Sequence, residues 1–319
     1  MSLGEFDLIS KYFTRTVTRA ALGVGDDCAL FAVAPGMQLA VSSDMLVEGR
    51  HFLPTMPPQR LGHKALAVNL SDLAACGARP VAFTLALALP RVDEQLLEGF
   101  ARGLLALADA HECELIGGDT TQGPFNICIT VFGEVPQGQA LLRSGARPGD
   151  DLYVSGTLGD ARLALEAFRG SVALEGAAFE SARLAMEQPQ PRVALGMALR
   201  GIATSAIDVS DGLLGDLAHV LRRSGVGADV EIDQLPRSAA LRAMPLAWQR
   251  ECTLAGGDDY ELVFTAPPQH AAQVRDAARA AQVDVTRIGG IVAAQGLRLI
   301  DERRQPIVNS FGSFDHFKT

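Results

Sequence analysis

Apolar strand-like segments alternate with amphipathic helical segments along most of this chain, and this alternation limits the folds that it can adopt. In the first half, apolar residues recur at helical spacing over residues 59–76 and about 93–110. Strand-like patterns cover residues 27–33, 38–42, 81–89, 113–116 and 125–135. Gly77 follows the first helical segment at the position of a helix C-cap. Strands and helices mixed in this way predict an α/β or α+β fold.

A passage rich in glycine and proline, residues 136–151, separates this first block from a second one. The second block contains a helix-rich stretch at residues 158–200 and predicted helices at residues 211–223 and 268–281. Its predicted strands cover residues 152–155, 205–208, 228–232, 260–265, 286–292 and 296–300. At roughly 100–200 residues per domain, the 319 residues also predict two domains. We therefore expect an N-terminal domain of residues 1–140 and a C-terminal α/β domain of residues 141–319.

The charge balance and the lack of long apolar segments exclude several classes of function. The chain has 28 basic and 37 acidic residues, a formal net charge of -9, which disfavours electrostatic binding of nucleic acid or an anionic membrane. Its longest apolar run, residues 81–89, is far shorter than the ~18 residues of a membrane-spanning helix, and its N-terminus lacks a signal-peptide pattern. The five cysteines show no Cys-x-x-Cys spacing, which predicts reduced thiols rather than disulfides or a zinc site. We expect a cytoplasmic protein with no nucleic-acid or membrane partner.

Aspartates at glycine- or serine-containing turns beside predicted strands and helices are the feature that points to chemistry. They occur in six places, at residues 25–27, 42–44, 69–72, 117–120, 208–212 and 256–259. One aspartate beside a glycine is usually a turn former, but six such places favour carboxylates that converge. Converging carboxylates repel one another unless cations neutralise them, and their oxygens select Mg²⁺, Mn²⁺ or Ca²⁺. The sequence therefore predicts an acidic site for several divalent metal ions.

A polyphosphate is the ligand that such a site predicts, because Mg²⁺ held by a few carboxylates commonly completes its coordination with phosphate oxygens. ATP is therefore the expected co-substrate. The chain has only three lysines, Lys11, Lys64 and Lys318, and none follows a glycine-rich loop, which excludes P-loop and protein-kinase chemistry. The segment Gly23-Val24-Gly25 lacks the third glycine of the dinucleotide-binding fingerprint.

Several of these motifs, taken in order, resemble the thiamine-monophosphate kinase family. The resemblance rests on residues 23–29, 64–75, 115–121, 207–212 and 256–262, and it extends from residue 4 to residue 317. The family belongs to the superfamily of aminoimidazole ribonucleotide synthetase and selenophosphate synthetase. The resemblance implies two α/β domains, a homodimer in which the N-terminal mixed sheets of two subunits pack together, and ATP-dependent phosphorylation of thiamine monophosphate to thiamine diphosphate.

The resemblance also implies roles for individual residues. The ligands of several Mg²⁺ ions correspond to Asp27, Ser42, Ser43, Asp44, Asp72, Asp119, Asp208 and Asp211. The ATP contacts correspond to Gly118, Asp119, Arg143 and Ser210. The thiamine monophosphate contacts correspond to His51, to one of Asp258 and Asp259, and to Phe314. The family often has Glu at position 258 and a larger or hydroxylated aromatic residue at position 314, so the choice between the two aspartates stays open.

Simpler interpretations of these residues are available. Asp208 and Asp211 could cap and charge the start of the helix predicted there, Arg143 could be a solvated charge, and His51 could be an ordinary loop histidine. A non-catalytic protein that binds divalent ions for stability is the alternative from another class. If the chain is a kinase, the acceptor phosphate already carries a negative oxygen. We therefore expect direct in-line transfer with no protein nucleophile.

The nearest enzymatic alternatives are other members of the superfamily. Selenophosphate synthetases carry a reactive cysteine or selenocysteine and a lysine in a glycine-rich N-terminal segment, and this chain has none there. The maturation proteins of hydrogenases end in a cysteine, whereas this chain ends in Thr319. Both differences favour the thiamine-monophosphate kinase assignment.

Overall fold

Two compact units divide the chain. The structure is a computed structural model that describes residues 4–312. Unit 1 runs to Gly138 but leaves out Ala74–Gly77, which together with the chain from Gln139 onwards form unit 2. The division at Gly138 lies beside the boundary of 140/141 expected from the sequence. Each unit contains one β-sheet, and we describe the two units separately.

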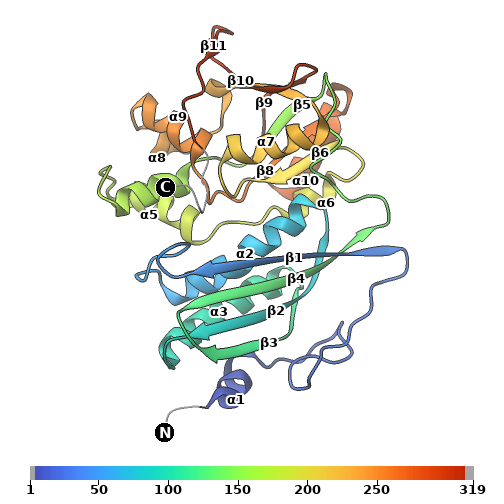
Figure 1. Ribbon diagram of the computed structural model, residues 1–319, viewed down its shortest axis with the longest axis vertical. Helices are drawn as coiled ribbons and strands as arrows, with labels where there is room; N and C mark the ends of the chain where they lie inside the picture. The colour runs from blue at the N-terminus through green and yellow to red at the C-terminus, as the bar shows by residue number, and fades with distance from the viewer. Residues whose placement is uncertain (1–3, 313–319) are drawn as a thin grey trace. The chain divides into compact units, whose positions relative to one another are not determined.

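Unit 1 contains a mixed four-stranded sheet with the strand order β1-β4-β2-β3 (Figure 1). Its strands are β1 (Met37–Val47), β2 (Arg79–Leu89), β3 (Glu114–Gln122) and β4 (Asn126–Pro136). Its helices are α1 (Glu5–Leu8), the π-helical η1 (Ile9–Phe13), α2 (Pro58–Ala75) and α3 (Glu94–Ala110). β4 pairs antiparallel with β1 and β2, whereas β2 and β3 are parallel. The structure therefore confirms the mixed N-terminal sheet that we expected.

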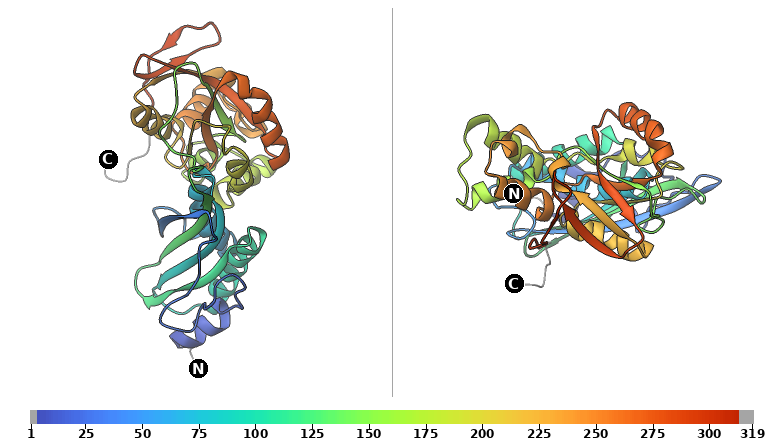
Figure 2. Two further views of the ribbon diagram at one scale, coloured as in Figure 1. Left: turned by 90° about the vertical axis from the view of Figure 1, so that its right-hand side faces the viewer. Right: turned by 90° about the horizontal axis from the view of Figure 1, so that it is seen from above.

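Helices α2 and α3 cover one face of this sheet (Figures 1 and 2). They approach each other closely, because a Cβ atom on Gly62 would lie 2.0 Å from the carbonyl oxygen of Phe100, and one on Gly103 would lie 1.8 Å from that of Gln59. The Asp93 side chain caps α3 by accepting from the Leu96 N–H at 3.0 Å. Gly77, with φ of +67°, follows α2 as the sequence predicts.

The other face of the sheet is exposed along β1. Leu39, Val41, Met45 and Val47 alternate with inward-facing residues and are 43%, 55%, 55% and 36% exposed. The strand that we predicted at residues 27–33 is wrong, because this segment forms only an isolated bridge between Leu22 and Leu30. The reason is the turn at residues 25–28, which is exposed and interrupts the alternation.

Unit 2 contains a seven-stranded sheet with the strand order β11-β10-β7-β9-β5-β8-β6. Its strands are β5 (Asp151–Ser155), β6 (Ser205–Asp208), β7 (Gly227–Glu231), β8 (Leu262–Ala266), β9 (Val285–Val292), β10 (Gly296–Ile300) and β11 (Pro306–Ile307). Its first helices are α4 (Asp160–Phe168), α5 (Gly176–Glu187), α6 (Val193–Ala198) and α7 (Leu213–Ser224). They are followed by η2 (Ile232–Gln234), α8 (Ala239–Arg242), α9 (Leu246–Ala255), η3 (Pro268–His270) and α10 (Ala271–Ala281). Sequence patterns did not predict α8 and α9.

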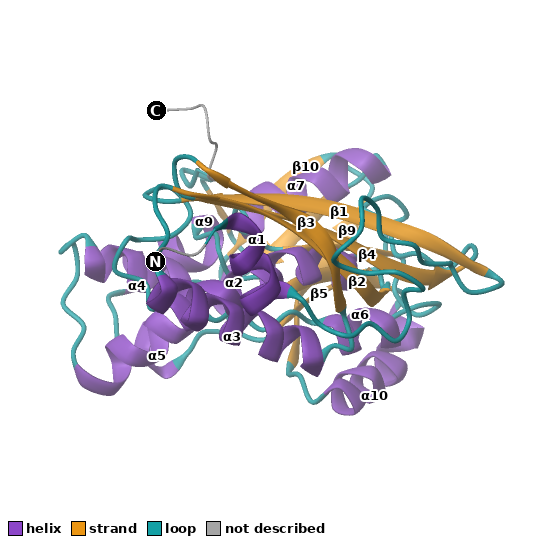
Figure 3. Ribbon diagram, turned by 90° about the horizontal axis from the view of Figure 1, so that it is seen from below, coloured by secondary structure: helices purple, strands orange, loops and turns teal. Residues whose placement is uncertain are grey.

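The central strands of this sheet carry the core of unit 2. Leu152, Val154 and Val263 are fully buried there and pack against Leu213 and Leu217 of α7. Helices α4 and α5 lie side by side (Figure 3) and enclose a second apolar cluster. No helix within residues 4–312 is long and apolar enough to cross a membrane. Both units are therefore mixed α/β structures, as predicted.

Candidate functional site

Strand β1 and helix α2 bring one group of predicted side chains together in unit 1. Ser42 Oγ donates to Asp72 Oδ2 at 2.5 Å, and the Asp44 N–H donates to Asn69 Oδ1 at 3.0 Å. Ser42 and Asp44 share a face of β1 because they are two residues apart, and Asn69 and Asp72 share a face of α2 because they are three apart. Asn69 is buried, and its Nδ2 donates to the Ala65 carbonyl at 3.0 Å, which turns its Oδ1 toward Asp44. We call Ser42, Asp44, Asn69 and Asp72 the β1–α2 cluster.

Ser43 and Asp119 lie elsewhere in unit 1. Ser43 points to the opposite face of β1, where its Oγ lies 3.0 Å from Thr130 Oγ1. Asp119 is exposed on β3, which is three strands away from β1 in the sheet. Three spacings of about 4.8 Å separate these strands by about 14 Å. Within one chain, Asp119 is therefore not part of the β1–α2 cluster.

Gly118 shows why a glycine precedes Asp119. Its φ is +151°, in the region that favours glycine, and a Cβ atom would lie 1.8 Å from the carbonyl oxygen of Leu85 on β2. A side chain at this position would separate β3 from β2. The glycine thus keeps Asp119 in register with Ala86 on the neighbouring strand.

Asp26 and Asp27 lie at the tip of a short hairpin. The Leu30 N–H donates to the Leu22 carbonyl at 2.9 Å, and Gly25 at the tip has φ of +121°. Asp26 Oδ1 accepts from the Asp27 N–H at 2.9 Å, so Asp26 is a turn former. Asp27 is exposed beside it. The carboxylate of Asp27 takes no part in this contact between the Asp27 N–H and Asp26 Oδ1.

His51 follows β1 in a tight turn. Its Nδ1 accepts from the Val47 N–H at 3.0 Å, so the neutral ring carries its proton on Nε2. The histidine is half-buried. Its position is therefore fixed by the end of the strand that carries Asp44.

In unit 2, Asp208, Ser210 and Asp211 form the loop between β6 and α7. Asp208 is buried at the end of β6, and Gly212, rather than either aspartate, is the N-cap of α7. The Ser210 and Asp211 N–H groups both donate to Asp216 Oδ2 at 3.0 Å. Burial, with the charge of Asp211, raises the pKa of Asp216 to about 7 despite these hydrogen bonds. Asp216 is a site residue that the sequence motifs did not indicate, although it lies in the first turn of the helix predicted there.

The loop of residues 256–261 is hydrogen-bonded to the loop of residues 208–211. The Asp258 N–H donates to the Ser210 carbonyl and the Tyr260 N–H to the Val209 carbonyl, both at 2.8 Å. A Cβ atom on Gly257 would lie 2.5 Å from the Ser210 carbonyl oxygen, so only glycine fits this contact. Two motifs that are distant in the sequence therefore form one surface of unit 2.

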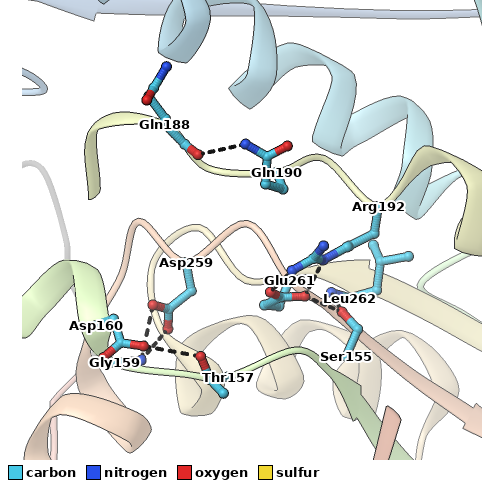
Figure 4. Close-up of polar contacts among 10 residues, drawn as sticks. All are labelled: Ser155, Thr157, Gly159, Asp160, Gln188, Gln190, Arg192, Asp259, Glu261 and Leu262. Atoms are coloured by element: carbon cyan, nitrogen blue, oxygen red, sulfur yellow. Dashed lines mark hydrogen bonds and ion pairs between the residues drawn. The ribbon is translucent and has the colours of Figure 1, made fainter. Parts of the chain in front are cut away.

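The two neighbouring aspartates of this loop have different environments. Both carboxylate oxygens of Asp259 accept from the Gly159 N–H, at 3.0 and 2.9 Å (Figure 4). Desolvation of this carboxyl group raises its pKa well above the ordinary value, with nearby Asp160 and Glu261 adding to the shift. Both aspartates are partly exposed, and Asp258 has a left-handed backbone with φ of +73°. Asp259 is thus held by Gly159, and the choice of ligand between the two aspartates stays a prediction.

A buried ion pair supports the same loop. Glu261 is paired with Arg192 through two contacts, one of them from Nε at 2.7 Å, and it accepts from Ser155 Oγ at 2.5 Å (Figure 4). Ser155 Oγ in turn accepts from the Leu262 N–H at 2.8 Å. No sequence motif indicated this network, because its members are far apart in the chain. It fixes the end of the loop that carries Asp258.

Two further predicted residues are less defined. Arg143 lies in unit 2, where its carbonyl accepts from Ser224 Oγ at 3.3 Å. Burial lowers the pKa of His219, with contributions from the charges of Arg222 and Arg143, while the charge of Asp211 opposes the shift. Phe314 lies outside the described residues.

The donor sets of the two units fit Mg²⁺ that is shared with a phosphate ligand. Within residues 4–312, no three histidine, cysteine, aspartate or glutamate side chains are grouped to hold a metal by themselves. The β1–α2 cluster offers two carboxylates and a hydroxyl, and the loop of residues 208–211 offers two carboxylates. Mg²⁺ is commonly held by one or two carboxylates, with water and substrate phosphates as its other ligands. The residues present therefore suit that ion.

Comparison with known proteins gives a consistent result. Residues 25–135 match the family of AIR synthase related proteins, N-terminal domain, and residues 147–302 match the corresponding C-terminal domain. The chain is 44% identical to the thiamine-monophosphate kinase of Salmonella typhimurium, with 100% of both chains covered. The crystal structure of thiamine-monophosphate kinase from Stenotrophomonas maltophilia K279a is similar with a TM-score of 0.86 and 47% identity, covering 94% of this chain and 97% of that one. The structure of AaThiL complexed with AMPPCP and TMP is similar with a TM-score of 0.78 and 28% identity, covering 90% and 89%.

Proposed function

This chain belongs to the thiamine-monophosphate kinase family, and we propose that it transfers the γ-phosphoryl group of ATP to the phosphate of thiamine monophosphate, which yields thiamine diphosphate. The observation that carries this proposal is the hydrogen-bonded pair of loops in unit 2. Ser210 and Asp211 on one loop lie beside Asp258 on the other, at the 2.8 Å contact between the Asp258 N–H and the Ser210 carbonyl. This arrangement supports a nucleotide contact next to an acceptor contact.

We assign the binding of several Mg²⁺ ions to oxygen donors of both units. In unit 1 they are Asp27, Ser42, Ser43, Asp44, Asp72 and Asp119, and in unit 2 they are Asp208 and Asp211. When bound, Mg²⁺ neutralises phosphate charge and orients the transferred group. The short contact between Ser42 and Asp72 supports the assignment, because it already holds two of these donors next to each other.

The nucleotide is assigned to Gly118, Asp119, Arg143 and Ser210. Arg143 supplies a planar guanidinium that suits phosphate oxygens. Thiamine monophosphate is assigned to His51, Asp258 and Phe314. The Asp258 carboxylate accepts from donor groups of the acceptor, and the contact between its neighbour Asp259 and Gly159 supports the choice of Asp258 over Asp259.

The chain's residues position the reactants rather than react with them. The acceptor phosphate carries its own negatively charged oxygen, so transfer proceeds in line without a protein nucleophile and without a strong general base. The role of His51 is to place the acceptor. Its Nδ1 is already engaged by the Val47 N–H, which suits a fixed donor at Nε2.

We also propose that the chain acts as a cytoplasmic homodimer. The exposed row of Leu39, Val41, Met45 and Val47 on the open face of the sheet is an apolar surface of the kind that a second copy covers. Sedimentation of the purified protein tests this proposal, and a monomer at micromolar concentration would contradict it.

The decisive experiment is a coupled assay of ADP release with thiamine monophosphate, with thiamine, and with no acceptor, each with and without Mg²⁺. We expect ADP only with thiamine monophosphate and Mg²⁺. Equal rates with thiamine, or no ADP with either acceptor, would refute the function. A non-catalytic ion-binding protein would give no ADP and would have no reason to bind the nucleotide.

A further inference from the structure

The hairpin that carries Asp27 belongs to a segment with almost no regular structure. Residues 14–36 form only isolated bridges, and the tip at residues 25–28 is exposed. The segment is nevertheless attached to the sheet of unit 1 at both ends of the hairpin. Two carboxylates, from β3 and from β4, make these attachments.

The first attachment is Glu114 on β3, which binds the chain where it enters the hairpin. Its Oε1 accepts from the Thr18 N–H and the Thr18 hydroxyl, both at 2.6 Å, and from the Arg19 N–H at 3.1 Å. Its Oε2 accepts from the Ala20 N–H at 3.2 Å. Consecutive N–H groups that converge in this way form an anion-binding concavity. Although burial acts to raise it, these donors hold the pKa of Glu114 below its ordinary value, so the side chain stays a carboxylate.

The second attachment is Glu134 on β4, which binds the chain where it leaves the hairpin. Only 1% of this side chain is exposed. Its Oε1 accepts from the Ala34 N–H at 2.9 Å, and its Oε2 accepts from Arg19 Nη2 at 3.1 Å and from Arg79 Nη2 at 2.8 Å. Arg19 therefore links the two attachments, because its backbone binds Glu114 and its guanidinium binds Glu134.

Apolar contacts hold the base of the hairpin in the same place. The Phe31 ring lies 5.5 Å from the Phe132 ring, measured between centroids. Val17, Ala29 and Phe31 pack against a buried cluster that includes Ile116 of β3. The base is thus fixed to the sheet, whereas the tip is held by its own turn. The direction in which Asp27 points depends on the base.

We propose that Glu114 and Glu134 are positioning residues that hold the hairpin so that Asp27 is presented to Mg²⁺. This inference rests on the proposed function and extends it to two residues to which no role had been assigned. Its physical basis is preorganisation: a hairpin that is already ordered loses less conformational entropy when the metal and nucleotide bind. Neither glutamate contacts the reactants in this arrangement.

The test compares Glu114→Gln and Glu134→Gln with Asp27→Asn and with the control Glu98→Gln, which changes an exposed glutamate paired with Arg102 on α3. We expect both positioning variants to raise the Mg²⁺ concentration for half-maximal rate by on the order of tenfold, the size typical of residues that orient metal ligands. The KM for thiamine monophosphate should change less than twofold. Without metal or nucleotide, amide hydrogen exchange should become faster at residues 18–34 and stay unchanged in α2.

If a glutamine variant does not fold, the milder variant Thr18→Val replaces it in the test. This variant removes only the hydroxyl that donates to Glu114 and keeps the backbone N–H groups that bind the same carboxylate. It should shift the Mg²⁺ dependence in the same direction by a smaller factor. Faster exchange at residues 18–34 with an unchanged Mg²⁺ dependence would overturn the inference, as would an equal rise in the KM for thiamine monophosphate.

The Asp27→Asn variant separates this inference from the proposed function. If the wild type phosphorylates thiamine monophosphate and Asp27→Asn leaves its Mg²⁺ dependence unchanged, the inference fails while the function stands. If the wild type does not phosphorylate thiamine monophosphate, the function fails. Calorimetry with Mg²⁺ and AMPPCP then still decides the inference, which requires weaker binding by both glutamine variants than by Glu98→Gln.

Discussion

Gly257→Ala tests the contact between the two loops of unit 2 directly. The added Cβ atom would lie 2.5 Å from the Ser210 carbonyl oxygen, about 0.9 Å closer than the 3.4 Å at which ordinary contact begins. Because the obstacle is backbone, no rotamer change relieves it, and the loops must separate by about that distance. The 2.8 Å hydrogen bond from the Asp258 N–H to Ser210 then becomes too long to persist.

Two magnitudes follow from this displacement. The lost hydrogen bond costs about 1 kcal/mol and the overpacking about 1–3 kcal/mol, so the free energy of unfolding should fall by about 2–4 kcal/mol. A shift of roughly 1 Å in a group that places a reactant lowers kcat/KM by on the order of 10²-fold. We therefore expect a large loss of activity at temperatures where the variant is still folded.

Urea denaturation and steady-state kinetics measure the two effects. Gly290→Ala in the same unit is the matched control, because its Cβ would meet no atom closer than 3.5 Å. That variant should stay within about 0.5 kcal/mol of the wild type and keep its activity. A Gly257→Ala protein with wild-type stability and kcat/KM would refute the assignment of this contact.

Three further predictions concern individual side chains. Asp44→Asn and Asp119→Asn should each abolish turnover and leave the circular dichroism spectrum unchanged, because each removes a proposed metal ligand worth several kcal/mol to the transition state. Near-normal rates at saturating Mg²⁺ would contradict the assignment of these residues as metal ligands. His51→Ala should raise the KM for thiamine monophosphate more than that for ATP, and γ-labelled ATP without acceptor should leave the wild type unlabelled; stoichiometric labelling that depends on His51 would show a covalent intermediate. Burial raises the pKa of Asp259, so the contribution of this group to stability is lost as the pH rises above the ordinary pKa range of an aspartate. Asp259→Asn should therefore weaken the dependence of the free energy of unfolding on pH. An unchanged pH dependence, measured by urea denaturation, would contradict this.

The sequence alone determined most of the local elements and the family. Helical spacing over residues 59–76 and Gly77 after it predicted α2 closely, because helix periodicity and capping depend on neighbouring residues. The same local geometry placed Asn69 and Asp72 on one helix face. The ordered motifs identified the family, since they preserve residue types and spacing over the full length.

Only the tertiary structure decided which of these residues meet. The strand order β1-β4-β2-β3 puts Asp119 on the strand farthest from Asp44, and no periodicity in the chain encodes that order. Adjacent residues in a strand point to opposite faces, but only the position of α2 shows that Ser42, rather than Ser43, faces Asp72.

The same holds for Asp258 and Asp259, which look equivalent in the sequence. Their difference comes from Gly159, a residue 100 positions away whose N–H binds Asp259. Glu261 likewise depends on Arg192, 69 positions away. Propensity and pattern report on contacts within a few residues, whereas these contacts form only when the chain packs. The physical role of each aspartate is therefore set by partners that the local sequence does not contain.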